Sequence, residues 1–321
     1  MFKRLRRKIL YSGTNRRLIA RTQRLVLPGF DGFSLYRISR FFFLALSEGR
    51  LVTRASAIAF KLFLAFFPTI ILLLTLIPYI PVDDFQEKLM GNFKDMLPLE
   101  VYNFIEGLLH DLVVRKHGTL LSVSFLIGIY LASNGMLAIM NGFQGSYHVT
   151  EWHSPMKERL ISMGLVLAIT VMMVIAMALL TLSNWAISLL GDHGYVLGML
   201  ERYGLFAAKW GITIFLMLSS VSLLYNAGDP HARRFRVFTP GAILTLLLTI
   251  LLSQALAYFF ANITNYNALY GSLGAILAVQ LWLYFNMIVL LIGFELNTSI
   301  SKARREHSDT LRIKTSPTAH A

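Results

Sequence analysis

The stretch from Asn265 to Asn297, NYNALYGSLGAILAVQLWLYFNMIVLLIGFELN, decides the class of this protein. Its apolar run from Gly271 to Leu296 is 26 residues long. A helix of that length, rising about 1.5 Å per residue, crosses a hydrocarbon core of about 30 Å with some tilt. The stretch therefore predicts a transmembrane helix that closes on a carboxylate, Glu295.

Polar residues interrupt this apolar helix on one side. Gln280, Tyr284 and Glu295 fall within about 60° of one another at 100° per residue. Polar side chains in a bilayer turn toward other helices or a wet cavity, because lipid leaves them unsatisfied. Before the helix, Asn and Gly residues predict a turn, since both tolerate left-handed backbone angles. The predicted turn residues are Asn265, Asn267, Gly271 and Gly274.

The composition agrees with a membrane protein. Hydrophobic residues make up 55% of the chain and charged residues 15%, whereas soluble chains carry about 25% charged residues. The net charge is +13, which suits either a nucleic acid or an anionic membrane surface. The positions of the basic residues along the chain distinguish the two. The chain has no cysteine, which excludes disulfides, thiolate metal sites and cysteine nucleophiles.

Apolar runs predict an all-α integral membrane protein with three regions. Residues 1–54 form a basic segment whose FSLYRISRFFFLAL pattern predicts an interfacial helix, residues 55–297 a six-helix domain, and residues 298–321 a flexible tail. Residues 81–118 predict a short outward-facing pair of amphipathic helices. The predicted spans are residues 55–80, 119–140, 160–182, 204–225, 238–263 and 271–296.

Lysine and arginine predict the orientation. The amino-terminal segment, the loops after spans two and four, and the tail carry 23 of them, and the other loops carry 5. Basic loops stay on the cytoplasmic side. Both termini are therefore predicted to be cytoplasmic, with the acidic loop 81–118 facing outward.

Catalytic signatures are missing from the sequence pattern. Eight histidines show no paired metal-binding spacing, and no phosphate-cradling glycine loop is present. A nuclease needs clustered carboxylates or histidines to hold metals and activate water. We therefore predict no enzyme activity, no metal, no cofactor, no ATPase and no nucleic-acid partner.

Glu295 is the strongest functional indication, because a carboxylate within a span costs about 2.5–3.5 kcal/mol on insertion scales. Lys61 and Glu295 are predicted at similar depth, each seven residues from a basic residue at the predicted membrane edge, Arg54 or Lys302. Two interpretations stay open. The two side chains form an ion pair between spans one and six, or Lys61 extends to the interface while Glu295 caps its helix end near water.

Other polar residues have similar alternatives. Asn134 either lines a path or forms an interhelical hydrogen bond, and Lys209 either binds an anionic headgroup or extends toward the interface. Basic residues near the cytoplasmic edge either bind anionic lipid or only set the topology. The headgroup candidates are Arg37, Arg40, Arg233, Arg234 and Arg236.

Three motifs resemble those of the YihY/virulence factor BrkB family: NYNALYGSLGAILAVQLWLY with GFELN, RASAIAFKLFLAFFP from Arg54 to Pro68, and ASNGMLAIMNGFQGSY from Ala132 to Tyr147. The resemblance covers about Arg54 to Leu296. It implies a six-helix bacterial inner-membrane protein with links to envelope integrity and serum resistance, and proposed roles in moving lipids or lipopolysaccharide. It also implies that the family's older label, ribonuclease BN, is a misassignment. Lys61 departs from the family pattern, which has an uncharged residue there.

Two main functions follow as hypotheses, and a ribonuclease stays a remote third that rests only on the family's older label. In the first, the protein binds or moves an anionic envelope lipid without ATP, along a path that includes Glu295, Lys61, Gln280 and Tyr284. In the second, it is a scaffold that recruits an envelope protein through residues 81–118. The oligomeric state is left open.

Overall fold

The computed structural model describes residues 29–76, 118–149, 152–192, 199–230, 236–262 and 272–315, with a few residues between these ranges. All regular structure in the described part of the chain is helical, which confirms the predicted all-α class. The helices are α3 (Leu35–Glu48), α4 (Leu51–Leu76), α7 (Gly118–Gln144), α8 (Pro155–Asp192), α9 (Met199–Gly228), α10 (Pro240–Asn262) and α12 (Ser272–Thr315). The predicted loop pair at 81–118 lies almost entirely outside the described residues.

Five described helices are long and apolar enough to cross a membrane: α7, α8, α9, α10 and α12. Helices suit this environment because their backbone hydrogen bonds are satisfied within the segment. The remaining predicted span coincides with α4, whose apolar second half has few described side chains. The count of six spans therefore stays a prediction.

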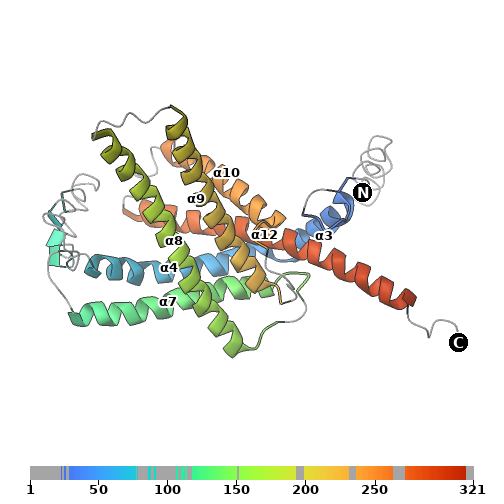
Figure 1. Cartoon of the computed structure of the whole chain (residues 1–321). Helices are drawn as coiled ribbons and strands as arrows, with labels where there is room; N and C mark the ends of the chain where they lie inside the picture. The colour runs from blue at the N-terminus through green and yellow to red at the C-terminus, as the bar shows by residue number, and fades with distance from the viewer. Residues whose placement is uncertain are drawn as a thin grey trace.

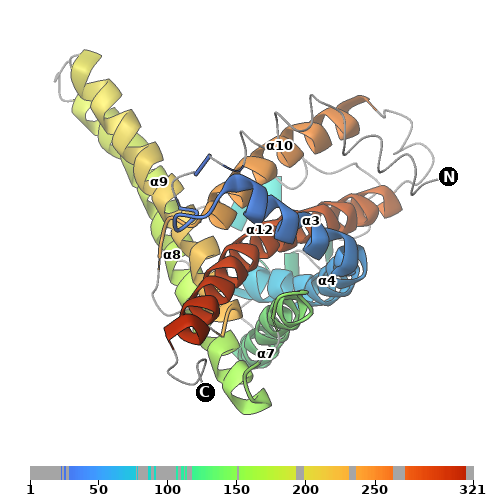
Figure 2. The same ribbon diagram turned by 90° about the vertical axis from the view of Figure 1, so that its right-hand side faces the viewer.

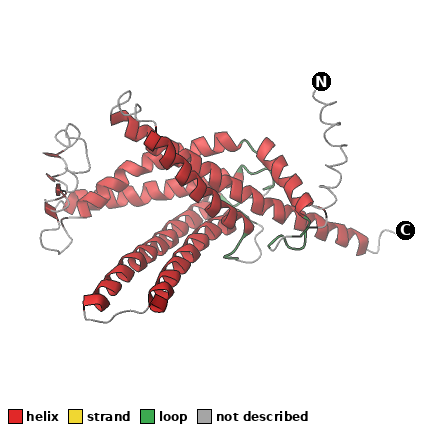
Figure 3. Ribbon diagram, turned by 90° about the horizontal axis from the view of Figure 1, so that it is seen from above, coloured by secondary structure: helices red, strands yellow, loops and turns green. Residues whose placement is uncertain are grey.

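The long helices form three antiparallel hairpins, α4 with α7, α8 with α9, and α10 with α12 (Figure 1). The hairpins lie close together at the end occupied by α3 and diverge toward the other end (Figures 1 and 3). In the view of Figure 2, the α8–α9 hairpin points away from the rest of the bundle. Helix α12 is central, because it packs against α3, α4 and α10.

The core lies where the hairpins converge. Phe143 of α7 and Phe294 of α12 stack with ring centroids 4.1 Å apart, and Tyr225 of α9 packs on both rings. Farther out, α8 and α10 expose large apolar side chains, including Leu167 at 69% and Leu251 at 65% of their surface. Such surfaces suit contact with lipid.

Helix α12 corrects the predicted flexible tail. The helix continues to Thr315, past the predicted end of the last span. Ile300 packs with Phe30 and Ile38, so α3 lies along the extension and buries its apolar face there. The N-cap of the amphipathic α3 is Ser34, whose hydroxyl accepts a hydrogen bond from the Arg37 amide at 3.4 Å.

Candidate functional site

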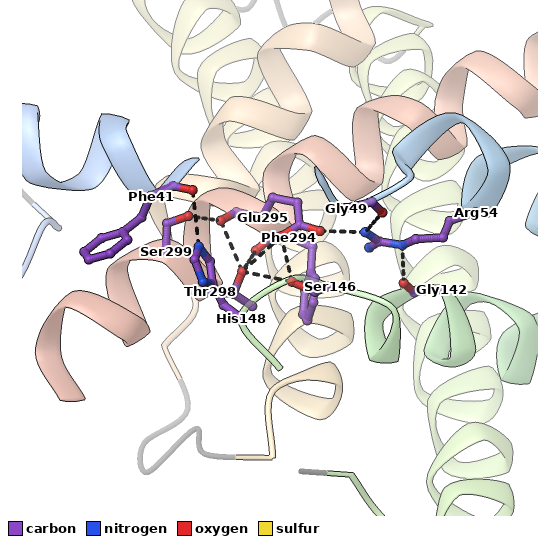
Figure 4. Close-up of polar contacts among 10 residues, drawn as sticks. All are labelled: Phe41, Gly49, Arg54, Gly142, Ser146, His148, Phe294, Glu295, Thr298 and Ser299. Atoms are coloured by element: carbon purple, nitrogen blue, oxygen red, sulfur yellow. Dashed lines mark hydrogen bonds and ion pairs between the residues drawn. The ribbon is translucent and has the colours of Figure 1, made fainter. Parts of the chain in front are cut away.

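Glu295 lies at a polar junction, which we define as Arg54, Ser146, Glu295 and Thr298. Its side chain is fully buried. One carboxylate oxygen accepts a hydrogen bond from Arg54 Nη1 at 2.7 Å, and the other accepts one from the Ser146 hydroxyl at 2.6 Å (Figure 4). The Thr298 hydroxyl, one turn along α12, lies 3.5 Å from the second oxygen. The buried charge is thus paired and hydrogen-bonded, as burial requires.

Arg54 connects three helices through one guanidinium. Besides Glu295, it donates to the Gly49 carbonyl at the end of α3 at 2.9 Å and to the Gly142 carbonyl in the last turn of α7 at 2.7 Å. Carbonyls at helix ends lack partners within their own helix, and a cation there is favoured by the helix dipole. Arg54 therefore donates hydrogen bonds to carbonyls at two helix ends and also neutralises the charge of Glu295.

Two glycines let the chain approach Arg54. A Cβ atom built on Gly145 would lie 3.0 Å from Arg54 Cδ, and one on Gly49 would lie 3.2 Å from Arg54 Nη1. Both distances are shorter than ordinary van der Waals contacts. The small residues in GFQGSY and SEGR thus have a packing reason in this structure.

Of the two interpretations left open for Lys61 and Glu295, the ion pair is wrong, and Glu295 is buried rather than close to water. Lys61 is exposed on α4, and Glu295 pairs instead with Arg54, two turns earlier on the same helix. Matching the depths of Lys61 and Glu295 requires Lys302 to mark the membrane edge. Since α12 continues as a helix beyond that point, Glu295 lies level with the start of α4 and the end of α7.

The structure places the other candidates separately. Tyr284 is partly buried against the core, and Gln280 has a buried Oε1 that lacks a hydrogen-bond partner among the described residues. Asn134 of α7 accepts a hydrogen bond from Arg159 of α8 at 2.5 Å. Lys209 is partly buried on α9, in a different hairpin.

The headgroup candidates are partly committed to ion pairs. Arg37 lies 3.3 Å from Glu306, and Arg236 lies 2.6 Å from Asp31. Arg40 is exposed on α3. The structure does not describe these remaining candidates: Arg233, Arg234, Asn265, Asn267 and Gly271. Gly274 lies in the first turn of α12, so its predicted place in a turn is wrong.

His148, in the turn after α7, adjoins the junction. Its Nε2 lies 3.2 Å from the Phe41 carbonyl of α3 (Figure 4). Burial lowers the pKa of His148 below its usual 6.5, against the opposing effects of the Phe41 carbonyl and Glu295. The folded protein therefore favours the neutral imidazole.

Acidification should destabilise the fold through His148. With its pKa lower in the folded state, the unfolded chain binds more protons, so the contribution of His148 is complete above about pH 6.5 and declines as the pH falls below it. We expect the melting temperature in detergent to fall more between pH 7.5 and pH 5.5 in the parent than in His148→Gln. His153→Gln, which leaves His148 in place, should behave as the parent. Equal pH dependence in His148→Gln and the parent would contradict this role.

Sequence reasoning missed the contacts of two arginines, Arg54 with Glu295 and Arg159 with Asn134. Arg54 is the first residue of the motif RASAIAFKLFLAFFP, and its place in that motif was the available signal. The predicted third span begins at residue 160 and leaves Arg159 just outside it. Among the residues that the structure describes, no group of three or more His, Asp or Glu side chains is arranged to hold a metal ion.

Comparisons with known proteins agree with the motifs. The family model of virulence factor BrkB matches residues 42–316. The putative ribonuclease-like protein YfkH of Bacillus subtilis is 27% identical over 262 residues, which cover 81% of this chain and 93% of that protein. A UPF0761 membrane protein of Xanthomonas campestris is 30% identical over 93 residues, covering 29% of this chain and 22% of that protein. No solved structure matches the chain significantly.

Proposed function

Since the chain belongs to the virulence factor BrkB family, we propose that it is a bacterial inner-membrane protein that binds and moves an anionic envelope lipid between leaflets without its own ATPase. Both termini lie in the cytoplasm in this proposal, in keeping with the distribution of basic residues. The polar junction around Glu295 then acts as the closed cytoplasmic base of the hairpins rather than as part of the path.

One observation carries the proposal: buried polar atoms inside the apolar helices that have no hydrogen-bond partner among the described residues. Buried and without a hydrogen-bond partner in the described part of the chain are Ser133 Oγ, Ser162 Oγ, Ser219 Oγ and Gln280 Oε1. Unsatisfied groups of this kind cost free energy in hydrocarbon. Water or a polar lipid headgroup moving between the diverging hairpins would satisfy them.

Lipid exchange in vesicles tests the proposal. Purified protein should exchange labelled phosphatidylglycerol between leaflets several times faster than protein-free vesicles, measured by the fraction of label accessible to an external quencher. Gln280→Leu removes one unpaired oxygen and should slow exchange. Asn286→Leu is the matched control on the same helix, because Asn286 donates to the Trp282 carbonyl of its own helix at 2.8 Å.

Two results would contradict transport. Folded protein that exchanges no labelled lipid would favour the scaffold, whose proposed partner site is the outward loop 81–118. Equal exchange in Gln280→Leu and Asn286→Leu, both at the parent rate, would remove Gln280 from the path.

A further inference from the structure

Arg159 has an unusual environment at the seam between α7 and α8. Its Nη1 donates to Asn134 Oδ1 at 2.5 Å, and its guanidinium carbon lies 5.1 Å from the centre of the Tyr130 ring. Tyr130 and Asn134 are four residues apart on α7 and so share one face of that helix. The guanidinium is therefore held against α7 by an amide and an aromatic ring.

The guanidinium lies beside the candidate membrane spans of both helices. The apolar spans include Phe125–Gln144 of α7 and Pro155–Ala176 of α8. Asn134 comes ten residues before Gln144, the last residue of α7, which corresponds to about 15 Å along a helix. The Arg159 side chain thus contacts α7 well before the end of that helix and does not simply extend into water.

No carboxylate neutralises Arg159 among the residues that the structure describes. Five other arginines have such a partner: Arg54 pairs with Glu295, Arg37 with Glu306, Arg236 and Arg304 with Asp31, and Arg305 with Asp229. Arg40 and Arg50 also lack a carboxylate partner among the described residues, but both are exposed. An unpaired guanidinium is expensive at membrane depth. Its environment therefore calls for an anion from outside the chain.

The seam is open to lipid on the same side. Tyr130 exposes 59% of its surface, and its neighbours along the two helices, Leu126 and Leu160, expose 68% and 72%. Apolar side chains with this exposure in a membrane helix contact acyl chains. A lipid beside the seam could therefore place its chains on these residues and its headgroup on Arg159.

We propose that Arg159, Tyr130 and Asn134 form a binding site for the phosphate of an anionic phospholipid. The site rests on the proposed function, because it identifies the lipid class and a position where the lipid binds. A guanidinium has five N–H donors in a planar fork that matches phosphate oxygens. Asn134 takes one of these donors and fixes the plane, Tyr130 supports the plane by a cation–π contact, and the remaining donors face the phosphate.

Photolabelling tests the site. The full-length protein is placed in vesicles that contain either a photoactivatable phosphatidylglycerol or a photoactivatable diacylglycerol, which lacks the phosphate, and labelled peptides are identified by mass spectrometry. The phosphatidylglycerol probe should label the α7 and α8 peptides around Tyr130 and Leu160. In Arg159→Gln this labelling should fall about tenfold, in line with loss of a charge-assisted hydrogen bond. Diacylglycerol labelling should not change.

Two variants separate recognition from folding. Lys157→Gln removes an exposed cation two residues away and should label as the parent does. Arg159→Lys keeps the charge and should retain more phosphatidylglycerol labelling than Arg159→Gln. Equal labelling in the parent and Arg159→Gln would overturn the site, and so would a matching loss of diacylglycerol labelling, which would indicate lost helix packing.

Leaflet exchange in the same vesicles distinguishes this site from the proposed function. Labelling that depends on Arg159 without any exchange by the parent protein would support the site and refute transport. Exchange at the parent rate in Arg159→Gln, with unchanged labelling, would refute the site and leave transport standing.

Discussion

Replacing Glu295 with Gln should lower the free energy of unfolding by about 3–5 kcal/mol, the usual effect of removing one partner of a buried ion pair. Glu295 is fully buried and Arg54 exposes only 11% of its side chain, so water cannot take the place of the lost carboxylate. The variant leaves a buried guanidinium without its counter-charge. Reversible unfolding in detergent, followed by intrinsic fluorescence, measures the change.

Helix α12 offers a matched control. Glu306 also pairs with an arginine, Arg37, but the two side chains are 41% and 36% exposed. Exposed pairs contribute about 0–1 kcal/mol, so Glu306→Gln should change stability little. The double variant Arg54→Met with Glu295→Met should recover much of the loss, because it removes both charges together. Equal destabilisation by Glu295→Gln and Glu306→Gln would contradict the junction.

The sequence indicated Glu295 but not its partner. A carboxylate in an apolar run stands out by its transfer free energy alone, whatever the fold. Whether Glu295 meets Arg54 or Lys61 depends on the axial position of α12 relative to α4. Arg54 and Lys61 are two helical turns apart, so a shift of that size changes the partner. Helix α12 continues into a polar sequence stabilised by Ile300 against Ile38 of α3, and such a long-range contact leaves no local pattern.

Arg159 was missed for a different reason. The sequence KER before an apolar run was assigned to a loop, because charged residues usually end a span. The structure instead begins α8 at Pro155, directly after Ser154. Serine before proline is a common helix start, so this signal was available. The contact between Arg159 and Asn134 cannot be predicted from the sequence, because it depends on how α8 crosses α7.

The motif GFELN places consecutive side chains of α12 against different neighbouring helices. Phe294 stacks on α7, Glu295 binds α4, Leu296 packs toward α3, and the Asn297 side chain accepts a hydrogen bond from the Gly241 amide at the start of α10 at 2.8 Å. A motif of this kind can be recognised from sequence, but its separate contacts require the fold.

Gly293, the first residue of that motif, permits a close approach between α12 and α10. A Cβ atom there would lie 2.6 Å from the Gly241 carbonyl oxygen of α10 and 2.5 Å from the Tyr225 hydroxyl, and it would overlap the Thr245 hydroxyl. The Tyr225 hydroxyl itself donates to the Leu290 carbonyl at 2.7 Å. The backbone of α10 cannot move aside without separating these groups.

Gly293→Ala should therefore destabilise the protein by about 3 kcal/mol, near the upper end for overpacking, although alanine favours a helix by up to about 1 kcal/mol over glycine. Gly164→Ala on α8 is the control, because a Cβ atom there meets nothing within 4 Å. The control should keep or raise the melting temperature in detergent while Gly293→Ala lowers it. The changes in melting temperature should have opposite signs. At Gly164 only the higher helix propensity of alanine acts, whereas at Gly293 the added methyl group also clashes with the α10 backbone. Equal melting temperatures for Gly293→Ala and Gly164→Ala would show that α10 and α12 do not approach closely at Gly293.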